Sequence, residues 1–459
     1  MFLKLSKLIF LLSIINISYY TEAVLDEGKN RSKCRSNGDK KLTEPDQDWG
    51  YVNVRPDAYM FWWLYFSTIK PYYSSAPLVI WLQGGPGGSS TGFGNFEEIG
   101  PLDVNLNPRN STWVQAANIL FIDNPVGTGY SYVTNDNAYT TNVDEIAVDL
   151  VTLLKQFYVK HSEFKTIPLY IFCESYGGKM TAAFSQAILK EMKEGRLSVD
   201  FRGLALGDSW ISPIDYVNTW GPYLYQTSLL DKRGLALVKK SANATENAYN
   251  DGDYEKATQL WGATETVIAE NTDNVDFYNI LLHDNTNNLF SMKKASHLPP
   301  ELKHLYLRHV SRFESDPLTE LMNGPIKKKL GIPDNVTWGA QANAVFAKQA
   351  GDFMKPVIDI VDDLLTNSTV KVVVYNGQLD LICDTPGTEL WVEKLTWPGL
   401  SSFDALKWTP LYTTGTQTKA FVKTFKNFSF YWIMNAGHMV PSDAPDMALK
   451  MLKMVVKDE

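Results

Sequence analysis

Ser175 is the residue whose surroundings most clearly suggest chemistry. It follows an apolar run, Leu169–Phe172, and precedes two glycines and a helix-compatible stretch that extends to Lys193. A buried strand, a tight turn and a helix in this order can present a serine hydroxyl as a nucleophile at the edge of a parallel sheet. The usual turn sequence is Gly-X-Ser-X-Gly, and here the small Cys173 stands in place of the first glycine. A serine that merely caps the helix is the alternative interpretation.

A serine nucleophile needs an acid and a base later in the chain, because hydrolases of this architecture carry the order serine, acid, histidine. Among six histidines, only His438 comes after the last strand-like run, Phe428–Met434. Asp380 follows the preceding strand-like run by a few residues and is favoured over Asp384. We therefore expect His438 to take the proton of Ser175 and return it to the leaving group, and Asp380 to orient the imidazole.

The transition state also needs donors for its developing negative charge. One donor is the backbone N–H of the residue after the nucleophile, Tyr176. A second should come from the loop after another central strand, and Leu78–Leu82 leads into the glycine-rich segment Gln83–Ser90. Glycines there would let backbone N–H groups approach a substrate, although an ordinary tight turn would have the same composition.

These residues require a sheet that brings several strand ends together. Apolar runs recur along the chain, and several are continuously apolar, as expected of strands buried on both faces. They are Tyr51–Val54, Tyr59–Phe66, Leu78–Leu82, Ile119–Ile122, Leu169–Phe172, Leu204–Leu206, Lys371–Tyr375 and Phe428–Met434. An amphipathic helix is indicated from Ile146 to Phe157. Strands that alternate with helices predict an α/β fold with a mostly parallel central sheet flanked by helices.

The chain between Ser175 and Asp380 is far longer than one strand and one helix need. Strand-like runs are absent there, and helical stretches such as Leu235–Asn250 and Tyr254–Asn271 dominate, which predicts an inserted, mainly helical cap. The predicted divisions are a signal peptide at 1–23, a flexible lead-in at 24–47, core segments at 48–210 and 351–459, and the cap at 211–350. The histidines of the cap lack metal-ligand spacing, and we expect them on a solvated helix.

Composition and the N-terminus indicate an exported protein. Hydrophobic residues make up 44% of the 459 residues, which suits a large core, and the net charge of −8 disfavours nucleic acid as a partner. Lys4 and Lys7 precede an apolar stretch too short to span a bilayer, which is typical of a secretory signal. We expect a secreted or lysosomal/vacuolar protein with no membrane span.

Three cysteines, Cys34, Cys173 and Cys383, allow one disulfide at most. The candidate glycosylation sites are the six Asn-X-Ser/Thr sequons, Asn30, Asn110, Asn243, Asn335, Asn367 and Asn427.

The motifs taken together resemble those of the serine carboxypeptidase family. They are Trp81–Ser90, Asn124–Tyr132, Glu174–Gly178 and the segments around Asp380 and His438, and the resemblance extends from about Asp48 to the C-terminus. It implies an α/β-hydrolase fold and the release of C-terminal residues from peptides through an acyl-enzyme, with no cofactor and no metal. The residues it implies are Ser175, Asp380 and His438 as the catalytic triad, the N–H groups of Gly85 and Tyr176 as the oxyanion hole, and Gln83, Gly84, Glu98 and Glu174 as the site for the substrate carboxylate.

Two departures from the family pattern lie in this region. Gln83 stands where most members have asparagine, and Gly88 where many have cysteine. Glutamine moves the amide by one methylene, so carboxylate binding is the property most open to change. Two adjoining glutamates cannot both ionise cheaply, so Glu98 and Glu174 should share a proton, bind an acidic group and favour an acidic pH optimum.

The expected partners are peptide or protein C-termini, and the expected state is a monomer or homodimer. An esterase or acyltransferase could use the same triad, because an alcohol can take the acyl group instead of water. A non-catalytic secreted binding scaffold is the remaining alternative. The intact set of Ser175, Asp380 and His438 argues against it, although the fold alone could not decide.

Overall fold

The computed structural model of the protein describes residues 44–69, 73–284 and 300–457. The predicted signal peptide, Asn30 and Cys34 lie outside the described residues. Strand β1 begins at Gln47, and the N–H of Phe66 donates to the carbonyl of Asp46 at 2.9 Å. The fold therefore includes the last four residues of the predicted lead-in, from Glu44 onward.

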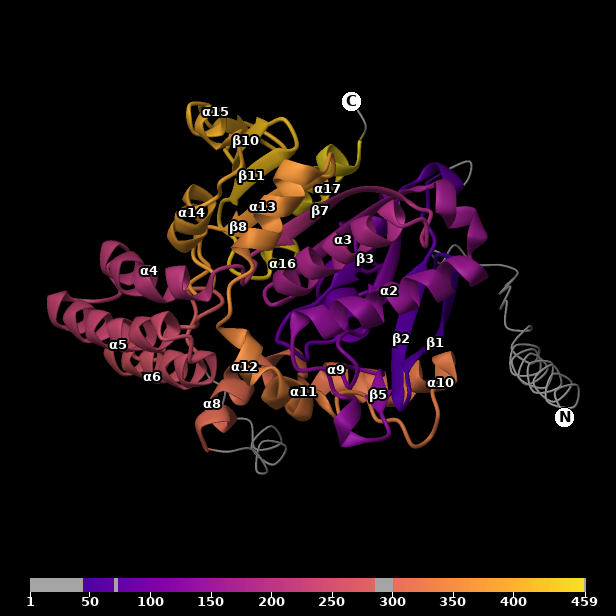
Figure 1. The fold of residues 1–459 in the computed structure, drawn as a ribbon, viewed down its shortest axis with the longest axis horizontal. Helices are drawn as coiled ribbons and strands as arrows, with labels where there is room; N and C mark the ends of the chain where they lie inside the picture. The colour runs from indigo at the N-terminus through magenta and orange to yellow at the C-terminus, as the bar shows by residue number, and fades with distance from the viewer. Residues whose placement is uncertain (1–43, 70–72, 285–299, 458–459) are drawn as a thin grey trace, which may run out of the picture. The chain divides into compact units, whose positions relative to one another are not determined.

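Within the described chain, eleven strands form one sheet (Figure 1). The order along it is β1-β2-β4-β3-β6-β7-β8-β11-β10-β9, with β5 paired to β2. The central strands β4, β3, β6, β7, β8 and β11 pair in parallel, and the outer pairs are antiparallel. Their bounds are β1 Gln47–Arg55, β2 Ala58–Tyr65, β3 Leu78–Leu82, β4 Asn118–Ile122, β5 Tyr132–Val133, β6 Pro168–Glu174, β7 Asp200–Gly207, β8 Lys371–Gly377, β9 Thr409–Leu411, β10 Ala420–Phe425 and β11 Phe428–Ile433.

Every strand-like run singled out in the sequence forms a strand, and the α/β prediction is confirmed. The short strands β5, β9 and β10 were not predicted. β10 pairs with both β11 and β9, but only its residues Ala420 and Val422 are buried, so it lacks the continuous apolar run of the central strands.

The sheet is buried on both faces, which explains its apolar strands. Along β3, Leu78, Ile80 and Leu82 belong to one hydrophobic core, and the alternate residues Val79 and Trp81 belong to the other. The first core is covered by α2 (Val143–Lys160), α3 (Gly177–Lys193) and α13 (Ile358–Asn367), and the second by α17 (Pro445–Val456). The amphipathic helix predicted from Ile146 to Phe157 is confirmed as part of α2.

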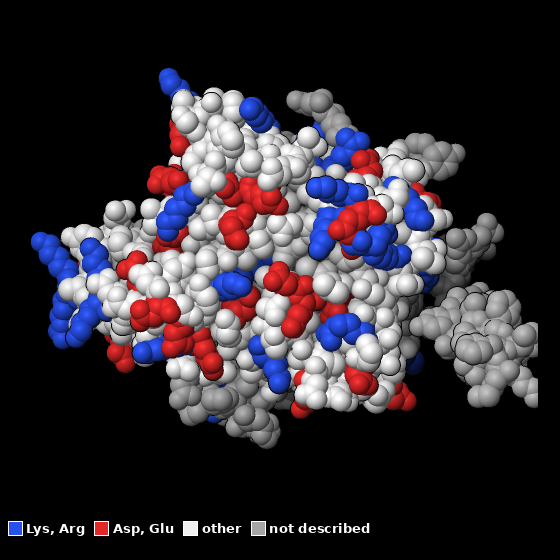
Figure 2. All heavy atoms as spheres, viewed as in Figure 1, with Lys and Arg blue, Asp and Glu red and all other residues white. Residues whose placement is uncertain are grey.

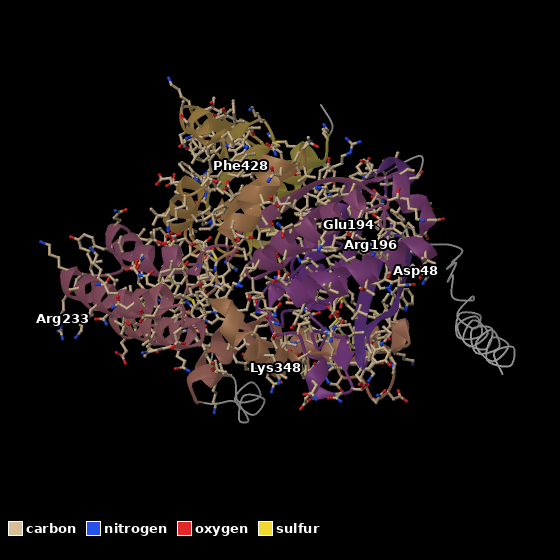
Figure 3. The ribbon with its side chains drawn as sticks, viewed as in Figure 1. Asp48, Glu194, Arg196, Arg233, Lys348 and Phe428 are labelled. Atoms are coloured by element: carbon tan, nitrogen blue, oxygen red, sulfur yellow. The ribbon has the colours of Figure 1, made fainter. Side chains whose placement is uncertain are left out.

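The chain between β7 and β8 is mainly helical, as predicted. Its helices are α4 Pro213–Gln226, α5 Lys232–Asn250, α6 Tyr254–Thr272, α8 Pro300–His309, α9 Asp316–Leu321, α10 Lys327–Leu330, α11 Ala342–Lys348, α12 Ala350–Phe353 and α13. Figure 1 shows α4, α5 and α6 side by side, and Figure 3 shows Arg233 of α5 and Lys348 of α11 at the surface of this region. The last of these helices, α13, packs on α3 and β8 and so belongs to the core. The boundaries of the cap at 211 and 350 stay a prediction.

Charged side chains of both signs are interspersed on the face of the molecule that Figure 2 presents. Close to the end of α3, Glu194 and Arg196 lie side by side as an ion pair (Figure 3). Among the helices of the described residues, none combines the length and apolar character required to cross a membrane.

Candidate active site

Ser175 occupies a strained turn between β6 and α3. Its φ of 62° is left-handed, a conformation that costs energy for any residue with a side chain. Three backbone hydrogen bonds hold it there: its N–H donates to Gly207 at 3.1 Å, and its carbonyl accepts from Gly178 and Trp210, each at 2.9 Å. The helix cap position belongs to Tyr176 and has no side-chain cap bond, so the capping interpretation of Ser175 is wrong. The turn has the strand–turn–helix geometry that a nucleophile elbow requires.

The turn accepts Cys173 because of the glycine on its other side. A Cβ added to Gly177 would lie 3.2 Å from the Cβ of Cys173 and 2.5 Å from the carbonyl oxygen of Leu82. Gly177 thus leaves the space that the larger residue at 173 needs. The Cys173 thiol lies 3.4 Å from the carbonyl oxygen of Ala205, and burial raises its pKa to about 11, so it stays protonated and unreactive.

His438 and Asp380 form a buried pair. His438 Nδ1 lies 2.9 Å from Asp380 Oδ2, and both side chains are fully buried. Asp384 has a different role, because it accepts from the N–H of Gly387 at 2.8 Å and so caps α14 (Thr385–Glu393). The prediction of Asp380 over Asp384 as the partner of the histidine therefore agrees with the geometry.

The second ring nitrogen of His438, Nε2, is buried and has no hydrogen-bond partner among the described residues. Ser175, Asp380 and His438 follow the carboxyl ends of β6, β8 and β11, which belong to the parallel part of one sheet and end at the same edge. No hydrogen bond joins Nε2 to Ser175 here. Such bonds are often long in free enzymes and tighten when substrate binds.

The glycine-rich loop after β3 packs directly on the elbow. A Cβ added to Gly84 would lie 2.5 Å from the Ser175 Cβ and 2.9 Å from the Tyr176 nitrogen. Gly85 has a φ of 110°, which residues with side chains rarely adopt. Among the described residues, neither the Gly85 N–H nor the Tyr176 N–H donates to another group. Both are therefore available to an oxyanion.

The residues predicted to bind a carboxylate lie beside this loop. Gln83 Nε2 donates to Glu174 Oε1 at 2.8 Å, and Trp81 Nε1 donates to Gln83 Oε1 at 2.8 Å. Glu98 lies on the π-helical segment η2 (Ser90–Ile99), and burial raises its pKa to about 7 although hydrogen bonding with Glu174 and Gln83 lowers it. Burial, and then the charge of Glu98, raise the pKa of Glu174 well above the usual value. Two buried carboxyl groups thus adjoin one amide.

Comparison with known proteins agrees with this geometry. A family model described as serine carboxypeptidase matches residues 38–458. The chain belongs to the serine carboxypeptidase family. It is 56% identical to the retinoid-inducible serine carboxypeptidase of Mus musculus, over 92% of this chain and 94% of the relative, and 43% identical to serine carboxypeptidase-like 51 of Arabidopsis thaliana, over 94% and 95%. This identity over most of the chain makes it a serine-type carboxypeptidase that acts on peptides.

A solved structure gives the same fold. The crystal structure of Kex1(delta)P, a prohormone-processing carboxypeptidase from Saccharomyces cerevisiae, matches with a TM-score of 0.75. The match covers 90% of this carboxypeptidase and 91% of that chain, at 22% identity, and so bears on the fold alone.

Sequence reasoning missed an acidic residue beside the candidate triad of this carboxypeptidase. Asp208 follows β7, and its Oδ1 accepts from the N–H of Gly377 at 2.7 Å. Burial, and then the charge of Asp380, raise the pKa of Asp208 well above its usual value. The signal in the sequence was an acidic residue directly after a buried strand, Leu204–Leu206, but many surface loops share that pattern.

Cys383 also lies at the site, because one donor atom each from Asp380, Cys383 and His438 falls within 4.8 Å of the others. Burial, and then the charge of Asp380, raise the pKa of the Cys383 thiol, and a protonated thiol is a poor metal ligand.

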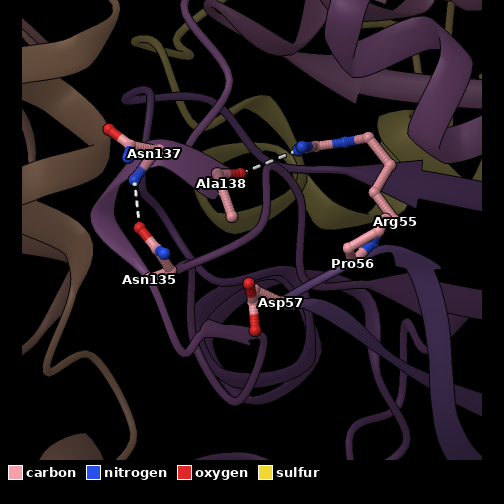
Figure 4. Close-up of a pocket in the computed structure, with 6 residues that line it drawn as sticks. All are labelled: Arg55, Pro56, Asp57, Asn135, Asn137 and Ala138. Carbon is pink, nitrogen blue, oxygen red and sulfur yellow. Dashed lines mark hydrogen bonds between the residues drawn. The ribbon is translucent and has the colours of Figure 1, made fainter.

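A separate hollow of about 310 Å³ contains none of these residues (Figure 4). It is lined by Arg55, Pro56, Asp57, Asn135, Asn137 and Ala138, and its arginine donates to the carbonyl of Ala138 at 2.8 Å.

The candidate glycosylation sites differ in exposure. The four sequons with exposed asparagines are Asn110, Asn243, Asn335 and Asn367. Asn427 is half-buried, and its Nδ2 donates to the carbonyls of Leu365 and Val370 at 3.2 and 3.3 Å. Because a glycan would replace one of the two hydrogens on that nitrogen, modification of Asn427 would cost at least one of these hydrogen bonds.

Proposed function

We propose that Ser175, His438 and Asp380 are the catalytic triad of this serine carboxypeptidase. The observation that carries the proposal is the buried 2.9 Å bond of His438 to Asp380, at the same sheet edge as a serine held in a left-handed turn. His438 Nε2 takes the hydroxyl proton as Ser175 Oγ attacks the carbonyl carbon of the last peptide bond. His438 then protonates the departing amine, and a water molecule hydrolyses the acyl-enzyme by the same steps. Asp380 keeps the proton of His438 on Nδ1 and stabilises the charged ring.

The backbone N–H groups of Gly85 and Tyr176 would form the oxyanion hole. Tyr176 lies where Gly84 packs on the elbow, Gly85 is the next residue of the loop, and neither N–H has a partner among the described residues. Donors held rigidly in this way stabilise the tetrahedral intermediate without reorganising when the charge develops.

Gln83, Gly84, Glu98 and Glu174 would recognise the free carboxylate of the substrate. The Gln83 amide and a proton shared by the two glutamates supply donors, and the raised pKa of Glu98, about 7, supports a proton held at acidic pH. Carboxylate binding would then weaken as pH rises through 7, which limits the enzyme to peptide C-termini in an acidic environment. We infer an acidic optimum and a secreted or lysosomal/vacuolar location, with glycans on exposed sequons and a monomeric or homodimeric state.

A covalent probe tests the nucleophile. The enzyme is incubated with a fluorophosphonate, digested, and the labelled peptide is sequenced by mass spectrometry, with Ser175→Ala and the nearby Ser209→Ala as matched variants. Label on Ser175 that disappears only in Ser175→Ala supports the triad. Label at another serine, or none in an active preparation, contradicts it.

A further inference from the structure

A short segment of the inserted region, Val275–Ile280, lies along both loops that carry the proposed acid and base; we call it the strap. Its contacts with these loops are main-chain hydrogen bonds. The N–H groups of Leu381 and Ile382 donate to the Phe277 carbonyl at 3.1 and 2.9 Å, the Ile280 N–H donates to the Leu379 carbonyl at 3.0 Å, and the His438 N–H donates to the Tyr278 carbonyl at 2.7 Å. One stretch of chain therefore fixes the acid loop and the base loop relative to each other.

The side chain of Tyr278 also contacts the imidazole of His438. The two ring centroids lie 4.7 Å apart and the ring planes meet at 85°, an edge-to-face arrangement. Tyr278 is buried, and the guanidinium of Arg312 lies 3.8 Å from the centroid of its ring. Asp380 bonds to only one nitrogen of His438, so a single hydrogen bond leaves the imidazole free to tilt about it. The tyrosine ring opposes that motion.

Two residues of the inserted helices anchor the tyrosine hydroxyl. It lies 2.9 Å from Nδ1 of His309, at the end of α8, and Nε2 of His309 lies 3.0 Å from Oε2 of Glu265 on α6. His309 is 2% exposed, so the expectation that it lies on a solvated helix is wrong. The sequence could not show this, because the three residues are far apart in the chain.

The chemistry of these groups gives the chain of hydrogen bonds one direction. Burial lowers the pKa of His309, which favours the neutral ring with one donor and one acceptor nitrogen. Glu265 also accepts from Arg308 at 2.9 Å, which favours its carboxylate form, and a carboxylate can only accept. Nε2–H of His309 therefore donates to Glu265, and Nδ1 accepts from the hydroxyl of Tyr278.

We propose that Tyr278 is a positioning residue for His438, held against the imidazole by the chain of hydrogen bonds through His309 to Glu265. The inference rests on the triad assigned under the proposed function. It gives the inserted helices a part in catalysis, because they keep the base aimed at the nucleophile. An error of about 1 Å in such aim can cost about 100-fold in rate.

Two substitutions separate the ring from the hydroxyl. Tyr278→Leu removes the contact with the imidazole, and we expect kcat to fall by about 100-fold while KM stays within about twofold, because an aiming error acts on the transition state. Tyr278→Phe keeps the ring and loses its anchor, so we expect a fall in kcat of about three- to tenfold. The downfield proton resonance of His438 Nδ1–H should broaden in both variants, because the imidazole becomes mobile.

Tyr306 provides the matched control. It is a fully buried tyrosine on the same helix as His309, and its hydroxyl lies 3.5 Å from Glu314 and not near His438. Tyr306→Leu should lower the melting temperature and leave kcat and the His438 resonance unchanged.

A folded Tyr278→Leu enzyme with wild-type kcat overturns the proposal. If that variant does not fold, Tyr278→Phe decides: wild-type kcat together with a sharp His438 resonance overturns it. Failure of the triad assignment would look different, since Ser175→Ala would then remain active. A silent Ser175→Ala enzyme beside fully active Tyr278 variants refutes only the positioning role.

Discussion

Replacing both Glu98 and Glu174 with glutamine should abolish the alkaline weakening of peptide binding. Burial raises the pKa of Glu98 from 4.5 to about 7, and burial with the charge of Glu98 raises the pKa of Glu174. The pair is therefore protonated in mild acid, and Glu98 begins to lose its proton near pH 7. A protonated pair can donate a hydrogen bond to the substrate carboxylate, whereas an ionised pair repels it.

The size of the effect follows from this pKa. If binding requires the proton, KM for a free-carboxylate peptide should rise about tenfold between pH 6 and pH 8. The double variant keeps side-chain size and hydrogen-bonding groups but has no proton to lose, so its KM should be higher and should change by less than about twofold over that range. Each single variant should fall between the two.

The stability of the folded protein should also decrease as pH rises. The folded protein keeps the Glu98 proton that the unfolded chain releases, so the free energy of unfolding should fall as pH rises from 4.5 to about 7. At about 1.4 kcal/mol for each tenfold change in an ionisation constant, Glu98 contributes about 3 kcal/mol to this fall. The double variant should lack that contribution.

The assays are KM against pH for matched acid and amide peptides, and urea unfolding against pH. Glu194→Gln, an exposed glutamate on the surface, serves as the control and should behave as wild type (Figure 3). The carboxylate-binding role of Glu98 and Glu174 is refuted if acid and amide substrates show the same alkaline rise in KM, or if the double variant retains the tenfold rise.

Three further predictions concern packing, charge and modification. A Cβ added to Gly88 would lie 3.1 Å from the Cγ of Gln83, so Gly88→Ala should destabilise the enzyme by about 1–2 kcal/mol. Gln83→Asn should relieve part of this loss. A double-mutant cycle by urea unfolding tests the coupling, and strict additivity would show that the two departures are unrelated. Asp208→Asn should be at least as stable as wild type at pH 7, because the buried carboxyl with its raised pKa destabilises the fold as pH rises above 3.8. Asp208→Ala should lose about 1–3 kcal/mol of stability, because it leaves the Gly377 N–H unpaired. An asparagine variant that is less stable than wild type in thermal melts would contradict this. Intact glycopeptide mapping of the protein secreted from eukaryotic cells should find glycans on the four exposed sequons and none on Asn427; full occupancy of Asn427 would mean that its hydrogen bonds to main-chain carbonyls are not kept.

The central strands and the candidate triad could be predicted from sequence because each depends on local pattern. Continuous apolar runs mark strands buried on two faces, and chain order alone placed Asp380 and His438 after the right strands. The outer strands β9 and β10 lack that pattern, because no residue of β9 and only two residues of β10 are buried. Sequence position favoured Asp380 over Asp384 but gave Asp384 no role of its own. The structure gives it one, because Asp384 caps α14.

The residues that pack against the candidate triad from the inserted region could not be predicted, because their roles depend on contacts between distant parts of the chain. Tyr278 and His309 come from the inserted region, and nothing near them in sequence indicates that one touches His438. The compensation of Cys173 by Gly177, and of Gln83 by Gly88, likewise appears only when opposite sides of a turn are placed together.

The proposed nucleophile and the requirement for a free substrate carboxylate can be tested together by the release of the C-terminal residue from a blocked dipeptide, followed by mass spectrometry. Wild-type enzyme and Ser175→Ala are compared at pH 5 on the free acid and on its C-terminal amide, with thermal melting to show that both proteins are folded. We expect rapid release from the acid, much slower release from the amide, and a loss of about 10⁴-fold or more in turnover for Ser175→Ala. Equal turnover of acid and amide, or a folded Ser175→Ala enzyme with near-normal activity, would contradict it.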